Sequence, residues 1–89
     1  MEKICFELDA DISLKAKGTL IVCLNLLERG INPTIENIKK HSADAERSIR
    51  TSLMELTELG YYAAIKFKKI DSPGFDWRYE VSKTREVCS

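Results

Sequence analysis

The sequence is poor in the residues that build metal sites and disulfides. Its 89 residues include one histidine and three widely spaced cysteines, Cys5, Cys23 and Cys88, with no C-x-x-C pair. An odd number of isolated cysteines is a weak disulfide framework, and a zinc site lacks ligands at any familiar spacing. We therefore expect no metal and no cofactor. Structural or incidental roles are expected for the cysteines, with Cys23 a small buried hydrophobic residue.

Long hydrophobic runs are also missing. The longest uncharged run covers residues 18–27, which is shorter than the roughly 20 apolar residues that span a bilayer. The first residues, MEKICFELDADIS, are acidic and lack the charged start and apolar centre of a signal peptide. These absences predict a cytoplasmic protein without membrane contact.

A net charge is absent as well, because 14 Lys and Arg balance 14 Asp and Glu. Proteins that bind polyanions usually carry a basic excess, so the total charge counts against a simple polyanion binder. The charge is unevenly spread, however: residues 1–11 carry a net −3, and the rest of the chain carries +3. A basic face is compatible with this distribution.

Signatures of catalysis are not found. The sequence contains no phosphate-binding glycine loop and no nucleophile with an identifiable base. The one histidine, His41, fits the end of a helix better than a catalytic role, because spacing identifies no partner for it. We expect no enzymatic activity and no small-molecule substrate.

A first helix is predicted over residues 13–29, capped by Ser13 and stopped by Gly30. Its core stripe is Ala16, Leu20, Cys23, Leu24 and Leu27. Apolar residues cover more than the ~100° arc that a surface helix needs. Either the N-terminal segment or another chain covers the surplus, and the candidate dimer surface is Ile21, Val22 and Leu26.

Two further helices are predicted before residue 60. Thr34 can cap a short one from Ile35 to about His41, and Ser42 can cap a longer one that Gly60 ends. The apolar stripe of the longer helix recurs at spacings of four, three and three residues: Ile49, Leu53, Leu56 and Leu59.

After Gly60 the hydrophobic period changes to two. YYAAIKFKKI and FDWRYEV alternate on either side of DSPG, which has the proline and glycine of a turn. We expect a β-hairpin whose aromatic residues Phe75, Trp77 and Tyr79 pack into the core, with base stacking as the alternative. The last residues, SKTREVCS, have no period and are expected to fray.

These elements divide the chain into an extended N-terminal segment (1–12), one domain (13–82) and a flexible C-terminal tail (83–89). The predicted domain is mainly α with a β-hairpin. A short helix, a tight connection and a longer helix form a helix-turn-helix unit. The hairpin directly after it makes the predicted fold a winged helix-turn-helix, with three helices and a wing sheet of two or three strands.

Four stretches resemble the winged-helix domains of phage and plasmid replication initiator proteins. They are SLKAKGTLIVCLNLL, TIENIKKHS, IRTSLMELTELGYY and GFDWRYEV, and the resemblance spans residues 12–82. It implies a bacterial or phage protein that binds DNA in transcription regulation or in DNA replication.

The third helix supplies the candidate DNA contacts, since in helix-turn-helix proteins its start enters the major groove. The side away from Ile49 offers Arg47, Arg50, Thr51 and Met54, with Ser48 flanking it. Arginine can donate two hydrogen bonds to guanine. Further backbone contacts are expected from Thr34, Lys39, Lys66, Lys68 and Arg78. Alternatively, the arginines are solvated and paired with nearby acids, and the hairpin lysines keep an edge strand from pairing with other chains.

Two functions are therefore expected. The first is sequence-specific binding of double-stranded DNA, by a homodimer or with a larger protein partner, because a small monomer offers few contacts. The second is a protein–protein interaction module that keeps the winged-helix shape without binding DNA. The zero net charge, Glu46 near the start of the third helix and the acidic N-terminus favour the second.

Overall fold

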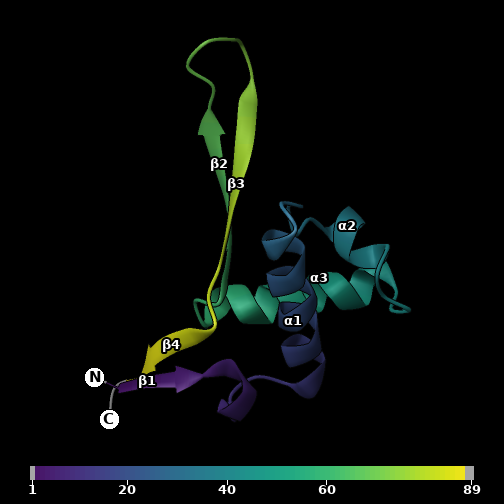
Figure 1. Ribbon diagram of the computed structural model, residues 1–89, viewed down its shortest axis with the longest axis vertical. Helices are drawn as coiled ribbons and strands as arrows, with labels where there is room; N and C mark the ends of the chain where they lie inside the picture. Colours follow the sequence, from purple (N-terminus) through teal and green to yellow (C-terminus); the bar gives the residue numbers. More distant parts are fainter. Residues whose placement is uncertain (1, 88–89) are drawn as a thin grey trace.

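The computed structural model of this chain describes residues 2–87 and has an α+β arrangement (Figure 1). Its helices are α1 (Leu14–Glu28), α2 (Ile35–Lys39) and α3 (Glu46–Glu58). In Figure 1, α3 runs horizontally through the helical part of the molecule and α1 crosses it. None of the helices within the described part of the chain has the length and apolar character needed to cross a membrane.

The strands form two separate two-stranded antiparallel sheets. β2 (Tyr62–Lys68) pairs with β3 (Phe75–Val81) in the predicted hairpin. β1 (Glu2–Cys5) pairs with β4 (Thr84–Val87), and a 3₁₀ turn, Phe6–Leu8, follows β1. The hairpin rises from the C-terminal end of α3 along the long axis of the molecule, while β1 and β4 lie beside the helices (Figure 1).

Both ends of α1 follow from the sequence. Ser13 Oγ accepts a hydrogen bond from Ala16 N at 3.1 Å, as predicted for an N-cap. At the other end Gly30 has a φ of +73°, and Ile31 N donates to Leu26 O at 2.9 Å. This is the hydrogen-bond pattern of a Schellman motif, which requires a residue that tolerates positive φ.

The short helix α2 also has its predicted cap. Thr34 Oγ1 accepts a hydrogen bond from Asn37 N at 3.1 Å. The helix ends at Lys39 and is therefore shorter than the predicted span to His41.

The start of α3 differs from the prediction. Ser42 does not cap the helix, because its Oγ accepts a hydrogen bond from Asp44 N at 2.9 Å within the preceding loop. The helix begins at Glu46 after Ala45, whose side chain makes no capping hydrogen bond. A serine that closes a local turn cannot also satisfy the first amides of a helix that begins several residues later.

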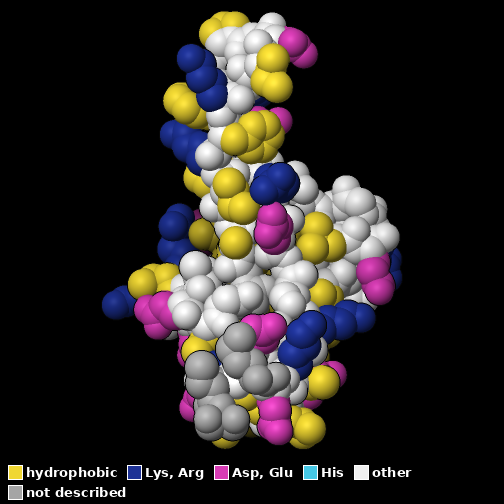
Figure 2. Space-filling view, turned by 90° about the vertical axis from the view of Figure 1, so that its left-hand side faces the viewer, with side chains coloured by type: hydrophobic (Ala, Val, Ile, Leu, Met, Phe, Trp, Pro, Cys, Tyr) yellow, Lys and Arg dark blue, Asp and Glu magenta, His cyan; other side chains and the backbone are white. Residues whose placement is uncertain are grey.

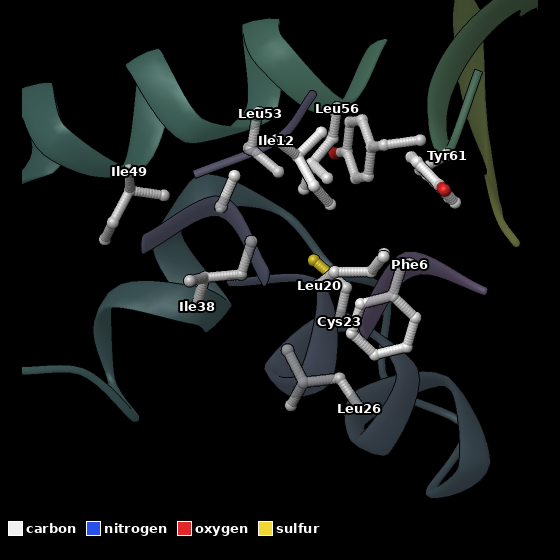
Figure 3. Packing of buried hydrophobic residues seen from close by; sticks show 12 residues of the cluster. Phe6, Ile12, Leu20, Cys23, Leu26, Ile38, Ile49, Leu53, Leu56 and Tyr61 are labelled. Atoms are coloured by element: carbon white, nitrogen blue, oxygen red, sulfur yellow. The ribbon is translucent and has the colours of Figure 1, made fainter. Parts of the chain in front are cut away.

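The hydrophobic core lies where α1, α3 and the N-terminal segment meet (Figure 3). It is one cluster of buried residues: Phe6, Ile12, Ala16, Leu20, Cys23, Leu26, Ile38, Ile49, Leu53, Leu56, Tyr61 and Tyr62. Cys23 is buried as predicted, and burial raises the pKa of its thiol to about 12. The predicted stripe residues Leu24 and Leu59 are partly buried against this cluster.

The predicted dimer surface is wrong for Leu26. Its side chain is buried within the chain itself, and the N-terminal residues Phe6 and Ile12 belong to the same cluster. The N-terminal segment therefore covers this part of the apolar surplus on α1, which the sequence had left open between that segment and a second chain.

The C-terminal segment is ordered rather than frayed over residues 84–87. β4 pairs with β1 in the register Glu2↔Val87 to Cys5↔Thr84. The predicted flexible tail, 83–89, is wrong for these four residues because backbone hydrogen bonds and side chains from the N-terminal segment hold them. Residues 88 and 89 of that tail lie outside the described range, so the role expected for Cys88 does too.

A buried ion pair fastens the two chain ends to the core. The carboxylate of Asp9 is almost fully buried and accepts hydrogen bonds from Arg85 Nη2 at 3.0 Å and from Tyr61 Oη at 2.8 Å. Hydrogen bonds from Arg85 hold the pKa of Asp9 well below its usual range, although burial alone would raise it. Arg85 also donates to the exposed Asp11 at 2.8 Å.

Two adjacent tyrosines attach the hairpin to the helices. Gly60, at φ +87°, ends α3, and both following residues are buried. Tyr61 Oη donates to Asp9 in the N-terminal segment, and Tyr62 Oη donates to Pro33 O at 2.9 Å in the α1–α2 connection. The base of the hairpin is therefore fixed to two different parts of the chain.

We expect Asp9→Asn to lower the free energy of unfolding at pH 7 by about 2–3 kcal/mol, because it removes the charge that Arg85 pairs with. The pKa of Asp9 is depressed in the folded state. Its contribution is therefore complete above the ordinary aspartate pKa of about 3.9 and is lost as the pH falls below that value. Urea unfolding at pH 7 and pH 3 should show a difference between the variant and the parent that shrinks at pH 3.

Asp11→Asn is the matched control. This carboxylate contacts the same arginine but is mostly exposed, so its removal should cost less than about 1 kcal/mol. Equal losses from the two variants, or a loss for Asp9→Asn that does not depend on pH, would contradict the assigned role of Asp9.

Candidate nucleic-acid interface

The side of α3 that faces away from the core carries a row of exposed residues. Ile49, Leu53 and Leu56 are buried on the inner side. We call the opposite side the outer face of α3; it comprises Arg47, Arg50, Thr51 and Met54, all of which are exposed. The helix turns its predicted DNA contacts toward solvent because the apolar residues recur at helical spacing on the other side.

Most polar groups of this outer face remain available to a partner. Arg47 has no ion pair among the described residues. Arg50 lies 3.9 Å from Glu46, and both side chains are more than half exposed, so this pair contributes little to stability. Thr51 Oγ1 donates to Arg47 O at 3.0 Å, and its oxygen can still accept a hydrogen bond.

Pairing in the hairpin sorts its side chains onto two faces, because residues opposite each other in an antiparallel pair point to the same side. The register pairs Ala64 with Tyr79, Lys66 with Trp77 and Lys68 with Phe75. We call this side the inner face of the hairpin: Tyr62, Ala64, Lys66, Lys68, Phe75, Trp77, Tyr79 and Val81. The opposite face of the hairpin carries Ala63, Ile65, Phe67, Asp76, Arg78 and Glu80.

A groove of about 730 Å³ separates the inner face of the hairpin from α3. Its walls are mostly apolar: Tyr62, Ala64, Trp77 and Tyr79 from the hairpin, Leu53 and Met54 from α3, and Ile35 from α2. Arg50 and Glu58 bring opposite charges to it, and Thr34 and Thr57 bring hydroxyls. Met54 and Trp77 are 64% and 48% exposed, so a partner can reach both walls.

The structure brings some of the predicted contacts together and separates others. Thr34 and Arg50 line the groove. Lys66 does not line it, but it lies on the inner face of the hairpin opposite Trp77, which does. Lys68 is one step further along the same face. Arg47, Ser48 and Thr51 belong to the adjoining first turns of α3, with Ser48 only half exposed.

Lys39 and Arg78 lie apart from this arrangement. Lys39 is in the last turn of α2 and does not line the groove. Arg78 is on the opposite face of the hairpin and pairs with Glu80 at 3.2 Å. The sequence could not separate Arg78 from the hairpin lysines, because the face that each residue occupies depends on the strand register.

The prediction that the aromatic residues of β3 pack into the core is wrong for two of the three. Phe75 and Trp77 are 59% and 48% exposed, whereas Tyr79 packs against the core and lies 6.5 Å from Tyr62 between ring centroids. The core reaches only the base of the hairpin. The alternation of aromatic and polar residues continues along β3 beyond that point, where the aromatic side chains are left exposed. Figure 2 shows hydrophobic and Lys or Arg side chains interspersed along the hairpin above the body of the molecule.

The predicted dimer surface on α1 is reduced to two residues. Ile21 is 48% exposed, and Val22 is partly buried against the core. They line a hollow of about 370 Å³ with Ile31 and His41, among others.

Within residues 2–87, no three His, Cys, Asp or Glu side chains are grouped as metal ligands would be.

No family model matches the chain, and searches of curated proteins and of solved structures found no match. The geometry of the groove and its two walls therefore has to support any functional proposal by itself.

We expect Trp77→Ala to change the free energy of unfolding by less than about 1 kcal/mol, because the ring is half exposed and lies outside the core cluster. Leu56→Ala, in contrast, should cost about 3 kcal/mol because it empties a fully buried site. Urea unfolding of both variants measures the difference. A loss for Trp77→Ala as large as that for Leu56→Ala would place Trp77 in the core.

Proposed function

We propose that this chain is a winged helix-turn-helix protein that binds double-stranded DNA in a sequence-specific manner, as a regulator of transcription or a module of replication initiation. Its role is binding rather than catalysis. α2 and α3 form the helix-turn-helix unit, and the β2–β3 hairpin is the wing. The single observation that carries the proposal is that the outer face of α3 and the inner face of the hairpin border one groove.

The charges around this groove support a nucleic-acid partner. Arg47 and Arg50 are exposed on the first half of α3, which is the part of a recognition helix that meets base edges. Lys66 and Lys68 extend the cationic surface along the wing, where each contact with a phosphate adds affinity that falls with salt.

The zero net charge is compatible with this proposal because the acidic residues are concentrated elsewhere. Residues 1–11 include four acids, of which Asp9 is buried and bound by Arg85. Asp76 and Glu80 lie on the opposite face of the hairpin. Glu46 and Glu58 remain near the proposed interface, and Glu46 is within reach of Arg50.

We expect Arg47→Ala/Arg50→Ala to weaken binding of a random-sequence duplex at low salt by at least about tenfold, because both side chains face the DNA. The slope of log affinity against log salt should become shallower by up to about 2, since two phosphate or base contacts are lost. Fluorescence anisotropy with a labelled duplex at several salt concentrations measures both quantities.

Lys3→Ala/Lys83→Ala is the charge-matched control, because both residues are exposed and line neither the groove nor the hollow beside α1. It should retain nearly the affinity of the parent chain. No duplex binding at low salt, or equal losses in the two double variants, would contradict duplex recognition by α3.

A second candidate function is a protein–protein interaction module, and exposed apolar residues on α1 and in the connection that follows it favour this function. Ile21 and Ile31 are 48% and 37% exposed beside the same hollow. A second copy of this chain is the simplest occupant, and it would also supply the dimer that specific DNA binding by a small domain needs.

If this surface mediates dimerisation, Ile21→Glu should convert a dimer to a monomer that still folds and unfolds cooperatively in urea, losing only the stability that association adds. Leu26→Glu should instead unfold the chain, because it places a charge in the core. Sedimentation and urea unfolding separate the two effects. A parent chain that stays monomeric at high concentration would rule out this interface.

A further inference from the structure

We propose that the inner face of the hairpin binds a single-stranded stretch of nucleic acid, whose unpaired bases stack on Phe75 and Trp77. Lys66 and Lys68 lie beside these rings and hold the phosphates. This activity goes beyond duplex binding, because it requires no base-paired partner.

The two aromatic rings are exposed and lie outside the core cluster. Phe75 and Trp77 lie above the part of the hairpin that the core covers, and their exposed fractions are 59% and 48%. Exposed large rings on a small domain mark an interaction surface when they gather on one side. Here the strand pairing puts both of them on the inner face.

The spacing of the rings favours a single strand over a duplex. Side chains two residues apart on one face of a strand are separated by about 6.8 Å, whereas stacked bases in a duplex strand are about 3.4 Å apart. Bases that lie on both rings must therefore be separated from each other, as they are in an extended, unpaired strand. Aromatic platforms of this kind bind bases without strong sequence preference.

The charge on this face selects a polyanion. Its strand residues include Lys66 and Lys68 and no acid, while Asp76 and Glu80 point to the opposite face. An apolar peptide on the same surface would have to desolvate the two lysines without pairing them. A nucleic acid pairs the lysines with phosphates and covers the rings with bases.

Lys66 is already close enough to Phe75 to bind the phosphate of a base stacked on that ring. Lys66 Nζ lies 4.4 Å from the centroid of the Phe75 ring, in a cation–π contact. A base that stacks on Phe75 takes the place of this ammonium group, which then remains within reach of the adjoining phosphate. The contact therefore holds Lys66 close to the base-binding ring in the absence of a ligand.

The groove below these residues gives the strand room to continue. Trp77 forms part of the groove wall, and Met54 faces it from α3. Arg50 lies at the same groove and can meet a further phosphate, whereas Glu58 limits the strand toward the C-terminal end of α3. The positive charge of Arg50 and the negative charge of Glu58 favour a path of the nucleic-acid strand from the hairpin toward the first turns of α3.

Trp77 is the only tryptophan in the chain, so its fluorescence reports directly on the proposed site. We expect an oligothymidylate of about 12 nucleotides, a length that one such site accommodates, to quench the emission at low salt and to release it at high salt. An oligouridylate of equal length tests whether RNA supplies the same groups; saturable binding of either strand supports the proposal. A base-free polyphosphate should bind weakly and leave the emission unchanged.

Two phenylalanines on opposite faces provide a matched pair of variants. Phe75→Leu should weaken binding of the labelled oligothymidylate by about fivefold or more. Phe67→Leu, which changes a 44% exposed ring on the opposite face of the hairpin, should leave the affinity unchanged. Lys66→Ala/Lys68→Ala should weaken binding and its salt dependence, whereas Arg78→Ala should not.

The proposal is overturned if no strand quenches Trp77 at low salt, if polyphosphate binds as well as the oligonucleotide, or if the two phenylalanine variants lose equal affinity. Arg47→Ala separates this result from the proposed duplex function, because Arg47 is exposed on the outer face of α3 and does not line the groove. If this variant loses duplex binding while the oligonucleotide still quenches Trp77 fully, the two binding activities depend on different residues.

Discussion

Two consecutive buried tyrosines determine how the hairpin stands against the helices. Tyr61 donates a hydrogen bond to the carboxylate of Asp9, and Tyr62 donates one to the carbonyl of Pro33. Burial and the nearby carboxylate raise the pKa of Tyr61 to about 12, so its hydroxyl remains a donor at any physiological pH. Because Tyr62 also lines the groove, the shape of the proposed interface depends directly on this attachment.

The same attachment connects the interface to the chain ends. Asp9 is held by Arg85 from β4 as well as by Tyr61, so the terminal strands, the end of α3 and the base of the hairpin share one polar centre. Buried charges are costly unless they are paired and hydrogen-bonded, and within residues 2–87 no buried side-chain nitrogen or oxygen lacks a hydrogen-bond partner. A change at Asp9 should therefore loosen the hairpin before it disturbs the helices around Leu20 and Cys23.

Much of the architecture could be predicted from local signals, and the site could be predicted only in part. The caps at Ser13 and Thr34, the glycine stop of α1 and the period-two strands depend on nearby residues, and all are confirmed. The pairing of β4 with β1 depends on contacts between Asp9 and Arg85, 76 positions apart, which no local pattern reveals. The exposure of Trp77 was missed because periodicity gives the face of a strand but not how far the core extends beneath it.

The central claim is that the outer face of α3 and the inner face of the hairpin form one nucleic-acid-binding surface. Nitrogen-15 NMR of the full chain, titrated with a short duplex that carries a single-stranded overhang, tests it most directly. The account predicts shifts at the amides of Arg47 and Arg50 and at the indole N–H of Trp77, with little change at Phe67 or along α1. Shifts confined to α1 around Ile21, or none at low salt, would contradict the account.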